Sequence, residues 1–197
     1  LHADALAEDS GVASGMTVYT LAEDVTDAAA LKLAERHAQN DILAGVDLAG
    51  DAVTLRSGQA NNDLTLGNVT AAGDLSVTSD ADILQTVGTS LTAGGGLTAT
   101  VSRVARGDVT FTEGVDVTGA ITVNNGDIVN INSTGTATSL GAIAAYDSLT
   151  VTSAGAISQS GAITQNNAAG SVTFTATGQT VDVSNAGNVF AAEVGAT

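Results

Sequence analysis

The chain has 197 residues, with 21 acidic against 5 basic side chains and with no cysteine, proline or tryptophan. This length allows one domain, or one domain with a short appendage. The formal net charge of −16 at pH 7 would repel nucleic-acid phosphates and anionic lipid headgroups, so neither is an expected partner. The lack of cysteine excludes a disulfide scaffold, a thiolate metal site and a cysteine nucleophile, and it is compatible with export from the cell.

Residues 1–41 differ in composition from the rest of the chain and are predicted to form an N-terminal appendage. Residues 26–39 are rich in strong helix formers, and Thr26 or Asp24 is placed to cap a helix there. We therefore expect one amphipathic helix over about 26–39. The sequence has no run of 18 apolar residues, so no membrane-spanning helix is expected.

Residues 42–197 consist of short runs that alternate apolar and polar residues and are separated by Gly, Asn, Asp, Ser and Ala. Such alternation is the pattern of a β-strand with one buried face. The runs are Ala52–Leu55, Asp63–Leu66, Asp74–Val77, Gly96–Ala99, Asp108–Phe111, Ile121–Val123, Asp127–Ile131, Ser148–Val151 and Ser171–Phe174.

The spacing of these runs predicts the fold. Many of their starts lie about eleven residues apart, or about twice that, so the sequence carries a degenerate repeat of about 22 residues, which is typical of a solenoid. The phase of the repeat slips between about 112 and 148, and the structure is expected to be irregular there. One coil cannot bury its own apolar face, whereas parallel stacking of coils gives a continuous core of Val, Leu, Ile and Phe.

An antiparallel β-sandwich is the alternative, because short strands every 8–12 residues also describe that fold. Near-identical motifs favour the all-β parallel solenoid, since the same residue class returns to the same place in each coil. These motifs are Asp-Leu-Thr-Leu at 63–66, Asp-Leu-Ser-Val at 74–77 and Asp-Val-Thr-Phe at 108–111.

Glycine and asparagine at the turns give two further expectations. A positive φ is expected at Gly94 to Gly96, Gly126 and Gly135. A stacked ladder of side-chain amides is an interpretation of Asn125, Asn130 and Asn132.

The stretches 72–78, 90–96 and 148–157 resemble the haemagglutinin-type repeats of large secreted bacterial exoproteins, the filamentous-haemagglutinin and autotransporter-like adhesins. The likeness covers roughly residues 41–190. It implies a right-handed parallel β-helix that forms the shaft of an extracellular protein involved in adhesion or surface assembly. The N-terminal helix departs from this family pattern.

Aspartate recurs just before the predicted strands, and two explanations are open. Carboxylates are the ligands that Ca²⁺ prefers, but aspartate also favours turns and strand starts through its side-chain hydrogen bonds. Asp80 with Asp82 is the best candidate pair for calcium, which is the one cofactor that the sequence suggests. The recurring aspartates are Asp41, Asp47, Asp63, Asp74, Asp82, Asp108, Asp116 and Asp127.

A polysaccharide-active β-helix enzyme is the enzymatic alternative. Acids one coil apart, such as Asp41 and Asp63, could face the same way and act on a glycosidic bond. Only Arg56, Arg103 and Arg106 lie beyond the predicted helix as basic side chains, and tryptophan platforms for a sugar are missing. We therefore expect no enzyme.

The expected function is structural and extracellular: the shaft or an assembly unit of an adhesin-like bacterial exoprotein. A self-assembling surface-layer subunit or a donor-strand filament subunit is the alternative within the same class. The expected partners are further copies of the chain in an oligomer or polymer, or more repeats in a larger chain, because an uncovered coil invites pairing. A host or cell-surface glycan or protein is a candidate ligand.

Overall fold

The structure is a computed structural model that describes residues 48–57, 61–102 and 106–197, and the predicted helix over 26–39 lies outside these ranges. Within them the regular elements are strands, which join into one 16-stranded sheet. The strands are β1 (Leu48–Gly50), β2 (Val53–Arg56), β3 (Leu64–Leu66), β4 (Val69–Ala71), β5 (Leu75–Ser79), β6 (Ile83–Gln85), β7 (Leu91–Ala93), β8 (Leu97–Val101), β9 (Gly107–Val117), β10 (Ala120–Ser133), β11 (Ala137–Ser153), β12 (Ala156–Gln159), β13 (Ile163–Gln165), β14 (Val172–Thr175), β15 (Val189–Phe190) and β16 (Val194–Ala196).

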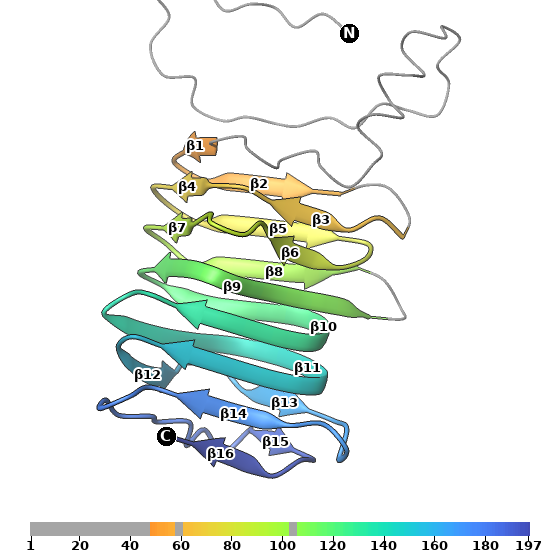
Figure 1. Ribbon diagram of the computed structural model, residues 1–197, viewed down its shortest axis with the longest axis vertical. Helices are drawn as coiled ribbons and strands as arrows, with labels where there is room; N and C mark the ends of the chain where they lie inside the picture. The colour runs from red at the N-terminus through yellow and green to blue at the C-terminus, as the bar shows by residue number, and fades with distance from the viewer. Residues whose placement is uncertain (1–47, 58–60, 103–105) are drawn as a thin grey trace, which may run out of the picture.

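The described strands wind into a stack of coils, as Figure 1 shows. Each pairing among them is parallel, from β1 with β4 near the start to β14 with β16 near the end. The coils number about six and repeat every 22 residues or so. The predicted all-β parallel solenoid is therefore confirmed, and the antiparallel sandwich is wrong for the part of the chain that the structure describes.

One row of side chains shows the register along the whole stack. We call the strands of this row the front stack, because they face the viewer in Figure 1. Direct partners in it are, in order along the axis, Leu64, Ile83, Val109, Val129, Leu149, Val172 and Val194. The first six are at most 4% exposed, so an apolar residue returns to the same inward position in every coil.

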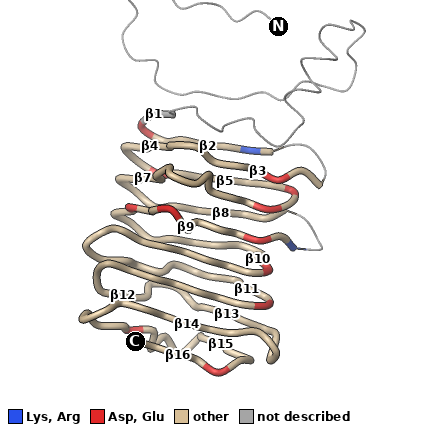
Figure 2. Tube along the Cα trace, viewed as in Figure 1, with Lys and Arg blue, Asp and Glu red and all other residues tan. Residues whose placement is uncertain are grey.

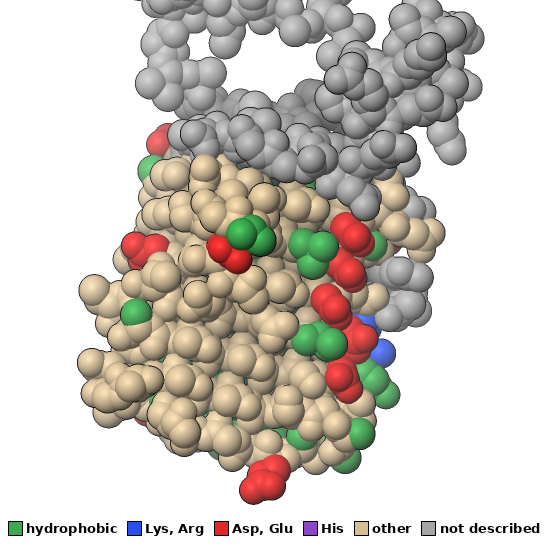
Figure 3. Space-filling view, viewed as in Figure 1, with side chains coloured by type: hydrophobic (Ala, Val, Ile, Leu, Met, Phe, Trp, Pro, Cys, Tyr) green, Lys and Arg blue, Asp and Glu red, His purple; other side chains and the backbone are tan. Residues whose placement is uncertain are grey.

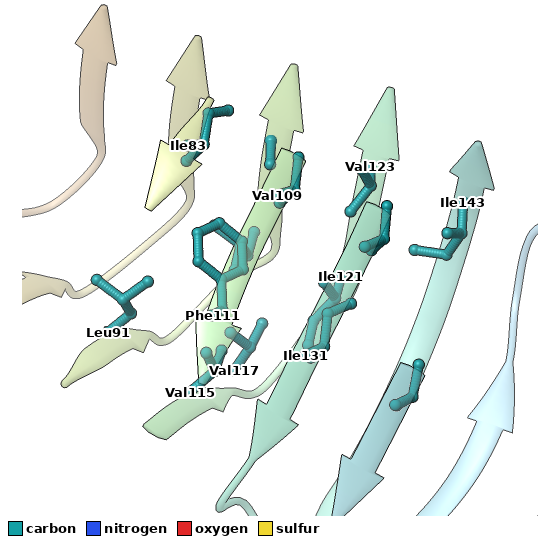
Figure 4. Close-up of a cluster of buried hydrophobic side chains, with 14 of the residues drawn as sticks. Ile83, Leu91, Val109, Phe111, Val115, Val117, Ile121, Val123, Ile131 and Ile143 are labelled. Carbon is teal, nitrogen blue, oxygen red and sulfur yellow. The ribbon is translucent and has the colours of Figure 1, made fainter. Parts of the chain in front are cut away.

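The core is thin and almost wholly aliphatic, as the sequence predicted. Phe111 and Phe174 are the largest fully buried side chains, and leucine, isoleucine and valine fill the remaining inward positions (Figure 4). In β5 the inward residues Leu75, Val77 and Ser79 are buried and alternate with half-exposed residues. Full burial of each such aliphatic side chain stabilises the fold by about 1.5–3 kcal/mol, so stacking the coils is what holds them folded.

The irregular region expected between about 112 and 148 is confirmed. Strands β9, β10 and β11 are 11, 14 and 17 residues long, and they continue around corners where other coils have loops. The register of β10 on β11 shifts between Ile121 and Val123, and twice more before Ile128. Such shifts are β-bulges, which bend a strand without ending it.

The glycines for which a positive φ was expected instead allow close approach between coils. Among the described glycines, φ is positive at Gly88, Gly114 and Gly178, so the expectation for Gly94 to Gly96, Gly126 and Gly135 is wrong. At one corner the N–H of Gly95 donates to the carbonyl of Gly73 in the preceding coil, at 2.8 Å. A Cβ on Gly95 would lie 2.9 Å from the carbonyl carbon of Gly73, so only glycine lets these coils approach.

Candidate functional site

A column of carboxylates runs along one edge of the solenoid, on the right in Figures 2 and 3. We call it the acidic edge and define it by Asp63, Asp82, Asp108, Asp127 and Asp147. Asp63, Asp82 and Asp108 lie at or just before the start of β3, β6 and β9. Asp127 and Asp147 lie inside the long strands β10 and β11, just before the part of each that joins the front stack. The repeat therefore brings to one line acids that are about 20 residues apart in the sequence.

Hydrogen bonds between coils hold the upper part of this edge. Oδ1 of Asp63 accepts from the backbone N–H of Asp82 at 3.2 Å, and Oδ1 of Asp82 accepts from the N–H of Asp108 at 2.9 Å. Oδ1 of Asp108 accepts from the N–H of Ile128 at 3.1 Å. Each carboxylate thus fastens the start of the strand in the next coil, which confirms for these positions the interpretation of aspartate as a strand-start residue.

Neighbouring acids disfavour the charge of Asp108. Burial raises the pKa of Asp108 above its ordinary value of 3.8, and the charges of Asp82, Asp127 and Asp147 raise it further. The hydrogen bond from Ile128 lowers that pKa and only partly offsets these effects. Ionisation of Asp108 at neutral pH is therefore unfavourable in the folded chain.

Arg106 brings a positive charge close to this edge. The guanidinium carbon of Arg106 lies 4.1 Å from the centre of the Tyr146 ring, which is a cation–π contact. Arg106 has a φ of 62°, as do Asn61 and Asn125 at the same corner of other coils. Asparagine tolerates this left-handed conformation and arginine does so less readily, so the contact with Tyr146 compensates for an unfavourable backbone.

The predicted calcium pair, Asp80 and Asp82, lies at the start of this edge. Oδ2 of Asp80 accepts from the N–H of Asn61 at 3.2 Å, while Asp82 fastens Asp108. Within residues 48–57, 61–102 and 106–197, no group of three or more His, Asp or Glu side chains is placed to hold a metal ion. Calcium binding at Asp80 and Asp82 stays a prediction, and Asp41 and Asp47 lie outside the described residues.

Three glutamines that the sequence analysis missed form a second kind of link between coils. They end β6, β12 and β13 in the motif Ile-x-Gln, at Gln85, Gln159 and Gln165. Each follows an inward isoleucine by two residues, so it occupies a position where the repeat predicts an apolar side chain. That polar exception is the sequence signal that could have found them.

Gln165 makes the most contacts of the three. It is fully buried, and its Nε2 donates to the carbonyl oxygens of Asp147 at 2.6 Å and of Asn167. Its Oε1 accepts from the N–H groups of Ala191 at 3.1 Å and Ala192 at 2.9 Å. One amide therefore joins three successive coils.

The front stack presents an uncharged outer face beside the acidic edge, visible as the broad tan area in Figure 3. Thr150 lies between Asn130 and Thr173 in the register, and Thr110 precedes Asn130. The predicted ladder of stacked asparagine amides is therefore wrong here, because the neighbours of Asn130 in the stack are threonines. Short hydroxyl and amide groups therefore cover this face.

The part of the chain that the structure describes contains no helix long and apolar enough to cross a membrane. A family model described as repeats of unknown function (DUF5649) matches residues 49–124 and 125–197. The boundary between the two matches falls inside β10, so the repeats join without a break in the stack. No curated protein and no solved structure matches the chain.

Proposed function

Because the chain belongs to the family of repeats of unknown function (DUF5649), and its two repeats form one solenoid, we propose that it is a structural rod. The rod would be the shaft or an assembly unit of an adhesin-like extracellular protein of bacteria. The observation that carries this proposal is the continuous core, in which the same inward position is apolar from Leu64 to Val172. A stack whose coils contact only their neighbours extends in one dimension, as a spacer must.

The surface composition supports the same proposal. The chain has no cysteine, and its net charge of −16 favours solubility and resists unspecific association. The resemblance to haemagglutinin-type repeats adds the adhesin-like, secreted setting. A glycan or protein on a cell surface is the partner class proposed for the larger assembly.

Mechanical unfolding of single molecules tests the proposal. With handles at both ends of the full chain, a rod of stacked coils should lengthen in steps of about one coil, each releasing about 75 Å at roughly 3.4 Å per residue. A Val151→Ala substitution in the core should lower the force of the steps, whereas Thr150→Ala on the outer face serves as the matched control. Unfolding in one event at low force would contradict a mechanical role.

An activity assay separates the rod from the enzymatic alternative. The chain is incubated with a panel of acidic polysaccharides and the release of reducing ends is measured. We expect none. Release that disappears in an Asp82→Asn variant would overturn the structural proposal, because that substitution removes a carboxylate and keeps its acceptor oxygen.

A further inference from the structure

The outer face of the front stack carries a regular grid of short polar side chains. It has two columns, and the residues of each column are direct partners in neighbouring coils. Thr110 continues the first column by one more coil, because it is the partner of Asn130. We call this surface the front grid and define it by Asn130, Asn132, Thr150, Thr152, Thr173 and Thr175.

The front grid is uncharged and its register is unbroken. The chain has 21 acidic side chains, yet those of the same coils lie at the acidic edge, where Asp127 and Asp147 precede the grid (Figure 3). The register shifts between β10 and β11 all lie before Ile128, and none follows between Ile128 and Ser133. The pairing of β11 with β14 is also continuous from Leu149 to Thr152. The grid is therefore a neutral surface with a constant repeat.

The repeat of the grid is close to that of ordered water. Neighbouring strands lie about 4.7–4.9 Å apart, and residues two apart in one strand lie about 6.6 Å apart. Hydrogen-bonded oxygens of water lie about 2.75 Å apart, so tetrahedral bonding places second neighbours in ice about 4.5 Å apart and gives a repeat of about 7.3 Å along its hexagonal axis. The closer match runs along the columns, where the three steps from Thr110 to Thr173 accumulate a difference of about 1 Å. The poorer match occurs only once, across the two columns.

We propose that the front grid binds ice. Its hydroxyl and amide groups bond to the outermost layer of water molecules, and its threonine methyl groups pack into the spaces between them. Threonine suits this task because branching at Cβ restricts χ1, so the hydroxyl and methyl groups are held in place before binding and little entropy is lost. The proposal adds a ligand to the rod proposed above, and it can fail while the rod remains.

Two other occupants match this surface less well. A crystalline polysaccharide presents the apolar faces of sugar rings, for which aromatic side chains supply the contact area, and the front grid has no aromatic residue. A second copy of the chain would bring a further acidic edge beside the first, and two chains of charge −16 repel each other. Ice has no net charge and offers both donors and acceptors, as hydroxyl and amide groups do.

The strands behind the front stack in Figure 1 provide an internal control. Strands β5, β8 and the first part of β10 carry a second grid, the back grid, which has limits that the front grid lacks. Arg56 borders it at one end, and the register of β10 on β11 shifts just beyond Ile121 at the other. The side chain of Asn124 also donates to Oγ1 of Thr100 at 3.1 Å, so polar groups of this grid bond to each other. The back grid consists of Ser76, Thr78, Thr98, Thr100, Thr122 and Asn124.

Partition into slowly growing ice tests the proposal on the full chain. A dilute solution is frozen slowly, and the concentration of the chain in the ice is compared with that in the remaining liquid, because growing ice excludes solutes that do not bind to it. We expect the wild-type chain to be enriched in the ice and to lower the freezing point below the melting point. Thr152→Lys should reduce the enrichment at least tenfold, because a long charged side chain holds the grid away from the ice. Thr98→Lys makes the same change in the back grid and should leave the enrichment unchanged.

The remaining outcomes overturn the proposal. A wild-type chain that growing ice excludes does not bind it, and equal losses in the two lysine variants would show that the front grid is not the binding surface. Retention of the wild-type chain on crystalline cellulose or chitin, abolished by Thr152→Lys, would assign the grid to a polysaccharide.

A gentler substitution keeps the test valid if Thr152→Lys unfolds the chain in urea more readily than Thr98→Lys does. Thr152→Ser removes only an exposed methyl group and frees the hydroxyl to rotate, so it should reduce the enrichment at least threefold. Unchanged enrichment in this variant contradicts the proposal. Stepwise mechanical unfolding of a chain that does not bind ice would leave the structural rod intact.

Discussion

The carboxylates of the acidic edge from Asp63 to Asp108 and the buried amide of Gln165 connect coils in different parts of the same solenoid by different chemistry. In the coils from Asp63 to Ile128, carboxylates accept N–H groups from the following coil. In the coils from Asp147 to Ala192, the buried amide of Gln165 does this and also donates to carbonyl oxygens. An ionised carboxylate accepts hydrogen bonds and cannot donate them, whereas an amide does both.

This difference sets how each region responds to its surroundings. Stacked carboxylates repel one another, so the acidic edge should be sensitive to pH and salt. A neutral buried amide brings no repulsion, but its loss removes several hydrogen bonds between coils. The comparison predicts large effects that do not depend on pH in the second region, and small effects that do in the first.

The largest effect is expected for Gln165→Ala. Truncation removes the buried amide that bonds the carbonyl of Asp147 and the N–H of Ala192, while the N–H of Ala191 keeps its bond to the backbone carbonyl of Gln165 at 2.9 Å. We expect a loss of about 3 kcal/mol in the free energy of unfolding, measured by urea denaturation and nearly constant between pH 4 and 8. The control is the exposed neighbour, Asn166→Ala, and equal losses in both variants would show that Gln165 does not join the coils.

The fold was largely predictable because it follows from the alternation of apolar residues and from the period of the repeat. Alternating apolar residues at Asp-Leu-Ser-Val and its repeats predict inward and outward faces, and their spacing predicts the stacking. The same argument explains the irregular region, since a slip of phase must appear as bulges in the register of β10 and β11. The strand-start role of Asp82 was also predictable, because aspartate before a strand has a local physical preference.

Other features depend on neighbours that lie about 20 or more residues away. The contact of Arg106 with Tyr146 requires knowing which corner residue meets which side chain in other coils. The prediction for the turn glycines was wrong because glycine is required both where φ is positive and where a Cβ has no space. Only the backbone of the neighbouring coil distinguishes the two reasons. In the sequence, Gln165 differs from the pattern only as a polar residue at a position where the repeat predicts an apolar one. Its partners lie in neighbouring coils, so the sequence does not show them.

The acidic edge gives the next largest effect, through Asp82→Ala. This substitution removes the acceptor for the N–H of Asp108 at a half-exposed place, where water can replace the bond. We expect a loss of about 0.5–1 kcal/mol in unfolding free energy. Asp82→Asn is the matched control, because it keeps the acceptor oxygen and removes a charge, and it should not destabilise at neutral pH. A loss in Asp82→Asn as large as in the alanine variant would mean that the charge itself holds the coils together.

A smaller, pH-dependent effect is expected for Asp108→Asn. The pKa of Asp108 in the folded chain is raised above 3.8, so its ionisation costs folding free energy, and wild-type stability at this site falls as the pH rises through that window. Asparagine keeps the bond to Ile128 without the charge. We expect a gain of less than about 1 kcal/mol at pH 7, reduced by solvent screening, which disappears below pH 3.8. Urea denaturation across pH measures the gain in stability, and NMR titration of Asp108 measures its pKa. A gain that persists in acid would mean that packing, and not charge, stabilises the variant.

The smallest effect is expected when a carboxylate is added at the end of the acidic edge, beside Asp147. Ser148 lies in register with Ile128, and its Oγ accepts from the N–H of Ser171 at 3.1 Å, as the aspartates do for their neighbours. Ser148→Asp keeps an acceptor there but adds a charge beside Asp147. We expect a loss of about 0.3 kcal/mol at pH 7 and low salt that is recovered by salt or by acid, because the repulsion is then screened or removed. Ser148→Asn, which supplies the acceptor without the charge, should show no such recovery. If both variants lose the same stability at every pH, the geometry of the serine is what matters, and charge does not distinguish the two regions at this position.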